Sequence, residues 1–326
     1  MQKKINIGIL GCAKIAERFM IPALLDLPNH FNIIGIASRD FTKASICAKR
    51  FNIKPYNGYQ DLLNDTLLDA IYIPLPNSLH AEWIEKALLN GLNVLVEKSL
   101  ACNYEDVERL TSIAKARNLV LVENFQFRFH SQLKFIKEKL ESGVIGELRC
   151  MRSSFGFPPF PEADNIRYNK ELGGGALLDA GAYPIKISQI FLGDDIEVKA
   201  ANLSFDEEKG VDIWGGAYLK QKNGNLFSEI AFGFDNFYQC NIELWGSAGK
   251  IYANRIFTAP PGFCPIVEIE TSKGINKIEL PEDHHFKNML LHFFNLIIFK
   301  ETVDIELSQN LNQARLINEI IYRNNE

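Results

Sequence analysis

The first third of the chain alternates short apolar runs with segments that have one apolar face. Apolar runs occupy residues 5–10, 31–38, 68–76, 92–99 and 119–125, and helix-like segments lie between them at 14–27, 41–51, 79–91 and 103–118. Apolar strands that alternate with amphipathic helices are typical of βαβ units around a parallel sheet. The pattern therefore predicts a Rossmann-type, doubly wound α/β domain over residues 1–123.

After residue 123 the apolar positions recur at every second residue. Segments with this period stand at 146–157, 198–205, 214–221, 225–234, 238–246, 250–259 and 265–272, and they predict strands of a mostly antiparallel sheet. Longer apolar-faced segments predict helices near 176–192 and 286–300 and a closing helix at 307–325. We therefore expect a second α+β domain over residues 124–326, with a large open-faced sheet.

Composition narrows the class of protein. The chain has 326 residues, of which 47% are hydrophobic and 23% charged, and its net charge is -5. These values fit a two-domain globular protein and give no indication of a nucleic-acid partner. The six cysteines show no metal-ligand spacing, the longest apolar run is far shorter than the roughly 20 residues of a membrane span, and no signal peptide is evident. We expect a cytoplasmic protein without a metal or a membrane partner.

The first strand runs into a modified dinucleotide-binding turn. The usual Gly-x-Gly-x-x-Gly appears as Gly11-x-Ala13-x-x-Ala16, directly before a predicted helix. The N–H groups at the start of that helix can bind phosphate oxygens. Glycine-containing turns are common, so the strand–turn–helix context carries this prediction of a bound dinucleotide.

The end of the second strand predicts which dinucleotide. An NAD site has an acid there for the ribose hydroxyl, whereas this chain has Ser38 and Arg39, with Lys43 one turn into the next helix. Asp40 comes slightly after the position at which that acid is expected. A hydroxyl and two cations suit a 2′-phosphate, which favours NADP(H). The alternative is a helix N-cap at Ser38 or Thr42 with solvated charges.

Polar residues that could carry chemistry follow the later strands. Lys98 comes after Glu97 at a predicted strand end, where a lysine can hydrogen-bond a substrate oxygen; the alternative is a solvated ion pair with Glu97. In "GGGALLDAGAYP", Asp179 and Tyr183 are four residues apart on one helix face. A phenol near a lysine can act as a general acid, although a core helix with a satisfied tyrosine fits as well. For His80, helix capping and packing is the favoured role.

Several segments in their order resemble the glucose–fructose oxidoreductase/inositol dehydrogenase/MocA family over essentially the whole chain. They are "IGILGCAKIA", "YIPLPNSLHAEW", "VLVEKS", "ENFQFRFHSQ", "ELGGGALLDAGAYP" and "ELWGSAGKI". The resemblance implies that Lys98 is the catalytic lysine and that Asp179 and Tyr183 are its partners from the second domain. It also implies a homo-dimer or homo-tetramer through the open sheet face. The implied cofactor contacts come from Gly11, Cys12, Ala13, Lys14, Ile15, Ser38, Arg39, Lys43, Leu75, Pro76, Asn77, His80, Glu97, Lys98, Asn124 and Arg128.

Within that family, three further stretches resemble the NDP-sugar 3-ketoreductases of deoxysugar biosynthesis. They are "GCAKIAERFMIPAL", "FGFPPFPEADNIRYNKELGGGALLDAGAYP" and "WGSAGKIYANRIFTAPP". This implies NADPH-dependent reduction of a keto group on a nucleotide-linked 6-deoxyhexose, with Phe155, Arg167, Asp179 and Tyr183 at the substrate and Tyr183 as proton donor. A surface salt bridge is the alternative for Arg167. Two other functions stay open: a dehydrogenase of a free sugar, polyol or dihydrodiol, and a cofactor-binding regulator.

One position departs from the family pattern. The family has Glu-Lys-Pro where this chain has Glu97-Lys98-Ser99. A cis peptide before a residue other than proline costs roughly 2.5–4 kcal/mol. We therefore expect a trans bond between Lys98 and Ser99, or a relaxed loop at this point.

Overall fold

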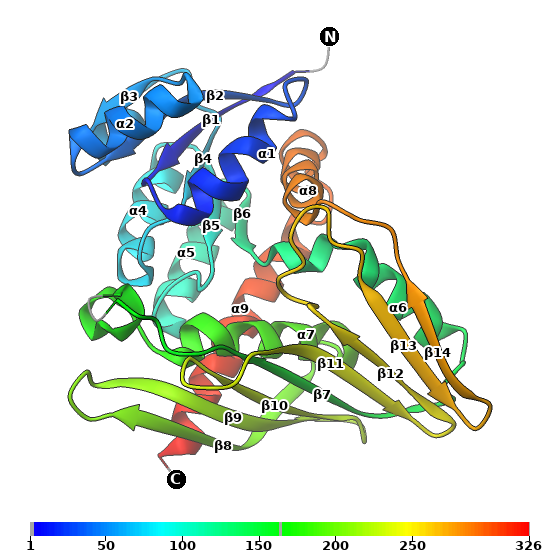
Figure 1. Cartoon of the computed structure of the whole chain (residues 1–326). Helices are drawn as coiled ribbons and strands as arrows, with labels where there is room; N and C mark the ends of the chain where they lie inside the picture. Colours follow the sequence, from blue (N-terminus) through cyan, green and yellow to red (C-terminus); the bar gives the residue numbers. More distant parts are fainter. Residues whose placement is uncertain (1–2, 163–164, 326) are drawn as a thin grey trace. The chain divides into compact units, whose positions relative to one another are not determined.

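The structure, a computed structural model, describes residues 3–162 and 165–325. The chain forms two compact units, coloured along the sequence in Figure 1. The first unit comprises the described residues up to Asn124 together with Phe286–Leu311, and the second comprises Phe125–His285 and the described residues from Asn312 onward. No helix in the described part of the chain is long and apolar enough to cross a lipid bilayer.

The first unit is built on a six-stranded parallel sheet in the order β3-β2-β1-β4-β5-β6. Its inner strands are almost wholly buried, which explains why they appear in the sequence as continuous apolar runs. The short strand β3 was not predicted. The strands are β1 (Ile5–Leu10), β2 (Phe31–Ser38), β3 (Pro55–Asn57), β4 (Ala70–Ile73), β5 (Asn93–Glu97) and β6 (Leu121–Asn124). The helices are α1 (Ile21–Leu25), α2 (Phe41–Phe51), α3 (Tyr59–Leu63), α4 (Asn77–Leu89) and α5 (Tyr104–Ala116), and a π-helical segment, Ala16–Met20, precedes α1.

Helix α8 (His285–Phe299) and the start of α9 (Val303–Asn324) belong largely to this first unit. The ring of Phe294 packs edge-on against those of His30 and Phe31, with centroids 4.8 and 5.9 Å away. Asn310 donates to the Leu121 carbonyl, 2.9 Å away, at the edge of the parallel sheet. The predicted assignment of all residues after 123 to one second domain is therefore wrong for Phe286–Leu311, because this returning segment buries its apolar face against the first unit.

The second unit contains an eight-stranded sheet in the order β14-β13-β12-β11-β7-β10-β9-β8. All neighbouring strands are antiparallel except β7 and β10, which confirms the predicted mostly antiparallel sheet. The sequence pattern predicted neither α6 nor the edge strand β14. The strands are β7 (Leu148–Gly156), β8 (Ile196–Asp206), β9 (Val211–Gln221), β10 (Phe227–Gly233), β11 (Gln239–Gly246), β12 (Gly249–Asn254), β13 (Ile266–Thr271) and β14 (Gly274–Glu279).

Helices cover one face of this sheet. Figure 1 shows α6 (Ser131–Glu141) and α7 (Ala182–Leu192) on the same side of the strands, and side chains from α7 and the sheet share one apolar core. Three short 3-10 helices, Gln126–Phe129, Ile166–Tyr168 and Lys170–Leu172, lie in the connections, and a π-helical segment, Leu177–Gly181, leads into α7. Because the core lies between helices and strands, the opposite sheet face carries the alternate, polar and aromatic, side chains.

Candidate active site

The carboxyl ends of the strands in the first unit form the edge at which the sequence predicts a bound dinucleotide. The strand order reverses between β1 and β4, and ligands of open parallel sheets bind at such a reversal. Gly11 follows β1 with a φ of 124°, and a Cβ there would lie 2.9 Å from a Leu75 methyl carbon. The position therefore requires glycine, while Ala13 lies in the turn directly before the helical run that begins at Lys14, and Ala16 lies within that run. Leu75 and Pro76 form the adjoining loop between β4 and α4.

The acid near the end of β2 is committed to capping a helix. The Asp40 carboxylate accepts from the backbone N–H groups of Thr42 and Lys43, at 2.9 and 3.3 Å, and caps α2. The Ser38 hydroxyl accepts from the Asp40 N–H, 3.2 Å away. The predicted alternative placed this cap on Ser38 or Thr42, so it named the wrong residue. Arg39 and Lys43 are exposed, and Ser38, not an acid, is the last residue of β2.

Asn77 does not cap α4. It is the first residue of the helix, and Pro76 holds the N-cap position without a side-chain cap. Proline before the first turn fixes the entry of the chain by its restricted φ. Asn77 directly follows the loop of Leu75 and Pro76, and its predicted cofactor contact stays a prediction.

Three neighbouring strand ends form a hydrogen-bonded cluster around Glu97. The Glu97 Oε1 atom accepts from the Tyr72 hydroxyl at 2.6 Å and from the Asn124 amide at 2.7 Å. Burial raises the pKa of the Glu97 carboxyl. The two hydrogen bonds and the charge of Lys98 act in the opposite direction, but burial is the larger effect. Lys98 follows at once and is half-buried. The Asn124 side chain is buried and supports Glu97, a role that its place in the sequence did not reveal.

The segment after Lys98 is held by its neighbours on both sides. The Leu100 N–H donates to Glu123 Oε1 at 2.9 Å, and the Ser99 carbonyl lies 2.7 Å from the His80 Nδ1 atom. The peptide bond between Lys98 and Ser99 is cis. The expectation of a trans bond or a relaxed loop is therefore wrong, since this segment is bonded within the unit.

In the second unit, the glycines before α7 make room for another part of the same unit. Gly175 has a φ of 118°, and a Cβ there would lie 2.3 Å from the Asp212 Oδ1 atom. The other carboxylate oxygen of Asp212 accepts from the Leu177 N–H at 2.6 Å. Burial raises the pKa of Asp212 to about 6, although backbone hydrogen bonds with Leu177, Asp212 itself and Ala176 act in the opposite direction and lower the pKa. Sequence reasoning missed Asp212, for which the only signal was an acid within an otherwise apolar strand.

Asp179 and Arg167 form an ion pair. The Arg167 Nε atom donates to Asp179 Oδ2 at 2.6 Å, and both side chains are partly buried. The charge of Asp179 raises the pKa of Arg167, whose guanidinium also lies over the Phe160 ring at 4.6 Å. The salt bridge considered for Arg167 is therefore present, in a half-buried form.

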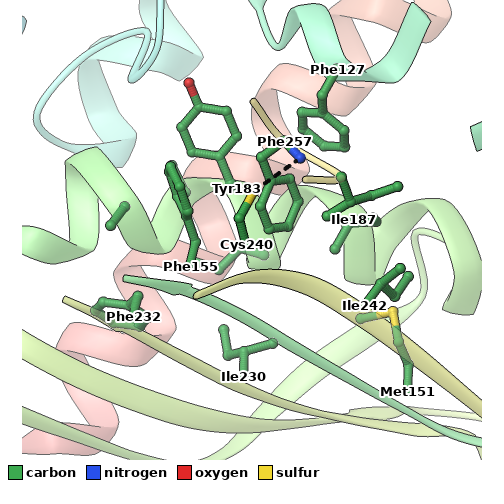
Figure 2. Packing of buried hydrophobic residues seen from close by; sticks show 14 of the residues in the cluster. Phe127, Met151, Phe155, Tyr183, Ile187, Ile230, Phe232, Cys240, Ile242 and Phe257 are labelled. Carbon is green, nitrogen blue, oxygen red and sulfur yellow. Dashed lines mark hydrogen bonds between the residues drawn. The ribbon is translucent and has the colours of Figure 1, made fainter. Parts of the chain in front are cut away.

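Tyr183 lies in an aromatic cage. Its ring is 5.0 Å from that of Phe155, 5.5 Å from Phe257 and 5.7 Å from Phe125, measured between centroids. Figure 2 shows the ring beside those of Phe155 and Phe257, with the hydroxyl oxygen pointing away from the sheet. Phe155 therefore packs against Tyr183, and its predicted place at the substrate stays a prediction. A phenol fixed in this way has little rotational freedom, which suits a proton donor.

The site residues thus fall into two sets, each coherent within its own unit. The cofactor candidates between Gly11 and Asn124 lie at or just after the carboxyl ends of the parallel strands of the first unit, as does Lys98. The second unit carries Phe155, Arg167, Asp179 and Tyr183, and also Arg128, which is half-buried with its guanidinium 5.1 Å from the Phe129 ring. In the described part of the chain, no group of His, Cys, Asp or Glu side chains is arranged to hold a metal ion.

Two family models match the chain and together span both units. Residues 5–125 match the model described as an oxidoreductase family with an NAD-binding Rossmann fold, and residues 133–252 match the GFO/IDH/MocA C-terminal domain. The protein therefore belongs to the Gfo/Idh/MocA oxidoreductase family, which confirms the resemblance seen in its motifs.

Similar proteins give a narrower comparison. The chain is 39% identical over 316 residues (97% of this chain, 94% of the relative) to a dTDP-3,4-didehydro-2,6-dideoxy-alpha-D-glucose 3-reductase of Actinomadura kijaniata. It is 40% identical over 293 residues (90% and 87%) to an enzyme of the same name from Saccharopolyspora spinosa. A solved structure of a 3-ketoreductase from A. kijaniata, in complex with NADP and TDP-benzene, superposes with a TM-score of 0.94 at 38% identity and covers 98% of both chains.

Proposed function

We propose that this protein reduces the C3 keto group of a dTDP-linked 3,4-diketo-6-deoxyhexose with NADPH. The observation that carries the proposal is similarity over nearly the full length to enzymes named as 3-reductases of such a sugar. A substrate of this kind has a ketone to accept hydride and a diphosphate and base for anchoring.

The residues of the first unit fit NADPH. The turn at Gly11 leads into backbone N–H groups at the start of a helix, which suit a pyrophosphate. Ser38, Arg39 and Lys43 offer a hydroxyl and two cations for a 2′-phosphate, while Asp40 is occupied as a helix cap. When bound, NADPH would supply the hydride.

Lys98 and Tyr183 act on the oxygen of the ketone. The Lys98 ammonium donates a hydrogen bond to that oxygen and stabilises the negative charge that develops on it. The Tyr183 hydroxyl then gives its proton to the same oxygen, so that the C=O group becomes CH–OH. The aromatic cage supports this role because it holds the phenol in one orientation.

Asp179 and Arg167 orient the substrate. The Arg167 guanidinium uses Nε for Asp179 and has further N–H donors, which we assign to the diphosphate of the substrate. Asp179 then fixes the direction of those donors. This combines the two roles that the sequence left open for Arg167.

Two experiments test the function. First, the melting temperature is measured with dTDP, UDP, GDP and CDP in the presence of NADPH, and we expect dTDP to give the largest increase, because a ligand of the folded state stabilises it. Second, NADPH oxidation is followed with the dTDP-diketosugar for the wild type, Lys98→Ala and Tyr183→Phe. Unchanged turnover in Tyr183→Phe would remove this residue as sole acid, and unchanged turnover in Lys98→Ala as well would refute the assignment.

The same experiments separate the alternatives. Oxidation of free sugars with NADP⁺, without a response to any nucleotide, would favour a dehydrogenase of free sugars, polyols or dihydrodiols. A tight NADPH complex that transfers hydride to none of these substrates would favour a regulator.

We further propose a homo-dimer or homo-tetramer built on the helix-free sheet face. Trp214 and Trp245 alternate with core residues along β9 and β11 and are 46% and 51% exposed. Apolar aromatic side chains on an open face are typical of protein interfaces. Light scattering of the wild type and of Trp245→Glu tests this proposal: a monomeric wild type would exclude it.

A further inference from the structure

His80 connects two loops of the nucleotide-binding edge with one side chain. It lies in the first turn of α4 and is fully buried, with 0% exposure. Its Nδ1 atom is 2.7 Å from the Ser99 carbonyl oxygen, and its Nε2 atom is 2.8 Å from the Leu75 carbonyl oxygen. Both ring nitrogens therefore face backbone acceptors within the first unit.

The two loops have different tasks in the proposed function. Leu75 precedes α4, and its side chain packs against the backbone of Gly11 at the turn assigned to the cofactor. Ser99 directly follows Lys98, the lysine assigned to the ketone oxygen. His80 is thus the side chain that connects the cofactor loop to the lysine.

The ring carries a single proton for these two acceptors. Burial lowers the pKa of His80 to about 4. Hydrogen bonds with the backbone of Ser99, Leu75 and Leu100 favour the charged form of the ring, but their effect is smaller than that of burial. At neutral pH the imidazole is therefore neutral and has one N–H group. Only one of the two carbonyls, which lie 2.7 Å (Ser99) and 2.8 Å (Leu75) away, can receive a hydrogen bond at a time.

We propose that His80 is a positioning residue for Lys98, and that its Nδ1–H group donates to the Ser99 carbonyl and holds the lysine segment in its working conformation. Glu123, on the neighbouring strand β6, holds the next residue, Leu100, so the segment is fixed on two sides. The inference rests on the proposed function in one respect: Lys98 must act in the reduction for its placement to affect the rate.

Two substitutions can retain one nitrogen position each. The amide of His80→Asn can occupy the place of Nδ1 and bond to Ser99, whereas that of His80→Gln reaches the place of Nε2 and bonds to Leu75. We expect His80→Gln to lower kcat by about ten- to a hundredfold with KM for NADPH nearly unchanged, since small displacements of a catalytic group have effects of this order. In His80→Asn, kcat should stay within about threefold of the wild type, as expected when one neutral hydrogen bond is retained.

Asn93→Ala serves as a matched control. Asn93 is also buried, and its side chain bonds to the Asp69 carbonyl and to the Val120 N–H at the opposite end of the same sheet. It should lower the melting temperature without a change in kcat. Equal losses of kcat in His80→Asn and His80→Gln, or no loss in either, would overturn the proposal.

A measurement on the wild type makes the inference independent of the variants and of the substrate. Histidine labelled with ¹⁵N reports which ring nitrogen carries the proton. We expect the Nδ1–H form for His80, and the Nε2–H form would overturn the proposal whatever the turnover. Conversely, an Nδ1–H ring in a protein that does not reduce the dTDP-diketosugar would refute the proposed function and leave the structural link between His80 and Ser99 in place.

Discussion

Replacing Asp212 by asparagine should stabilise the second unit at neutral pH. Asp212 lies on β9 with 8% exposure, and its carboxylate accepts from the N–H of Leu177 at the start of the helix that carries Asp179 and Tyr183. Burial raises the pKa of Asp212 from 3.8 to about 6. The folded state therefore retains a proton that the unfolded chain releases over this interval.

Proton linkage gives the sign and size of the change that Asp212→Asn makes in the free energy of unfolding. Since the folded state binds the additional proton, the contribution of Asp212 to the free energy of unfolding falls as the pH rises from about 4 to about 6 and is constant above. Each pKa unit corresponds to about 1.4 kcal/mol, so ionisation costs about 3 kcal/mol. Asparagine avoids this cost, and its amide oxygen can still accept from Leu177. Because a charge-assisted hydrogen bond is lost, we expect a net gain of about 1–3 kcal/mol at pH 8.

Calorimetric melting between pH 4 and pH 8 checks this expectation. The variant should melt higher than the wild type by on the order of 5 °C at pH 8, and the two proteins should converge at pH 4. The exposed acid Asp235, in the same unit, provides the control Asp235→Asn, which changes the net charge equally. A less stable Asp212→Asn at pH 8, with the pH dependence of the wild type, would refute the reasoning and show that the ionised carboxylate is the preferred cap.

Three further predictions concern the first unit. Arg39→Ala should weaken NADPH binding by about ten- to a hundredfold and leave NADH binding nearly unchanged, as titrations of cofactor fluorescence would show. A hydrogen bond from Cys47 lowers the pKa of the Cys12 thiol. Iodoacetamide should therefore alkylate Cys12 before the other cysteines, and bound NADPH should slow this alkylation. Peptide mass spectrometry measures the order of alkylation and the protection by NADPH. Tyr72→Phe removes the 2.6 Å hydrogen bond to Glu97 and should reduce the free energy of unfolding by about 1–3 kcal/mol in urea melts.

Much of the fold could be predicted because it rests on local periodicity. The buried parallel strands and the alternating strands of the second unit leave clear patterns in the sequence, and both were found. Strand β14 was missed because it is an edge strand whose residues are mostly exposed, so it shows no apolar alternation. The position of α8 could not be predicted, because an apolar helix does not indicate which of two units it will pack against.

Some residues of the candidate site could be predicted from local motifs, and others could not. Lys98 and Tyr183 stood out by motif, but their supports depend on residues that only the fold brings together. The cluster of Tyr72, Glu97 and Asn124 requires the strand order β4-β5-β6, and Asp212 meets Leu177 across 35 positions of sequence. Local patterns therefore predict candidate residues for the chemistry, and the tertiary contacts show what holds those residues in place.

The return of the chain to the first unit has a consequence for biosynthesis. Because Phe286–Leu311 completes a unit that began at the N-terminus, the ribosome must make the whole of Phe125–His285 before the last helix of that unit exists. At ordinary elongation rates the nascent nucleotide-binding sheet stays without this cover for on the order of ten seconds or more. Residues 1–124 expressed alone would expose the surface of Phe31 and Leu121 that this segment covers, and the protein is best produced and dissected as a full-length chain.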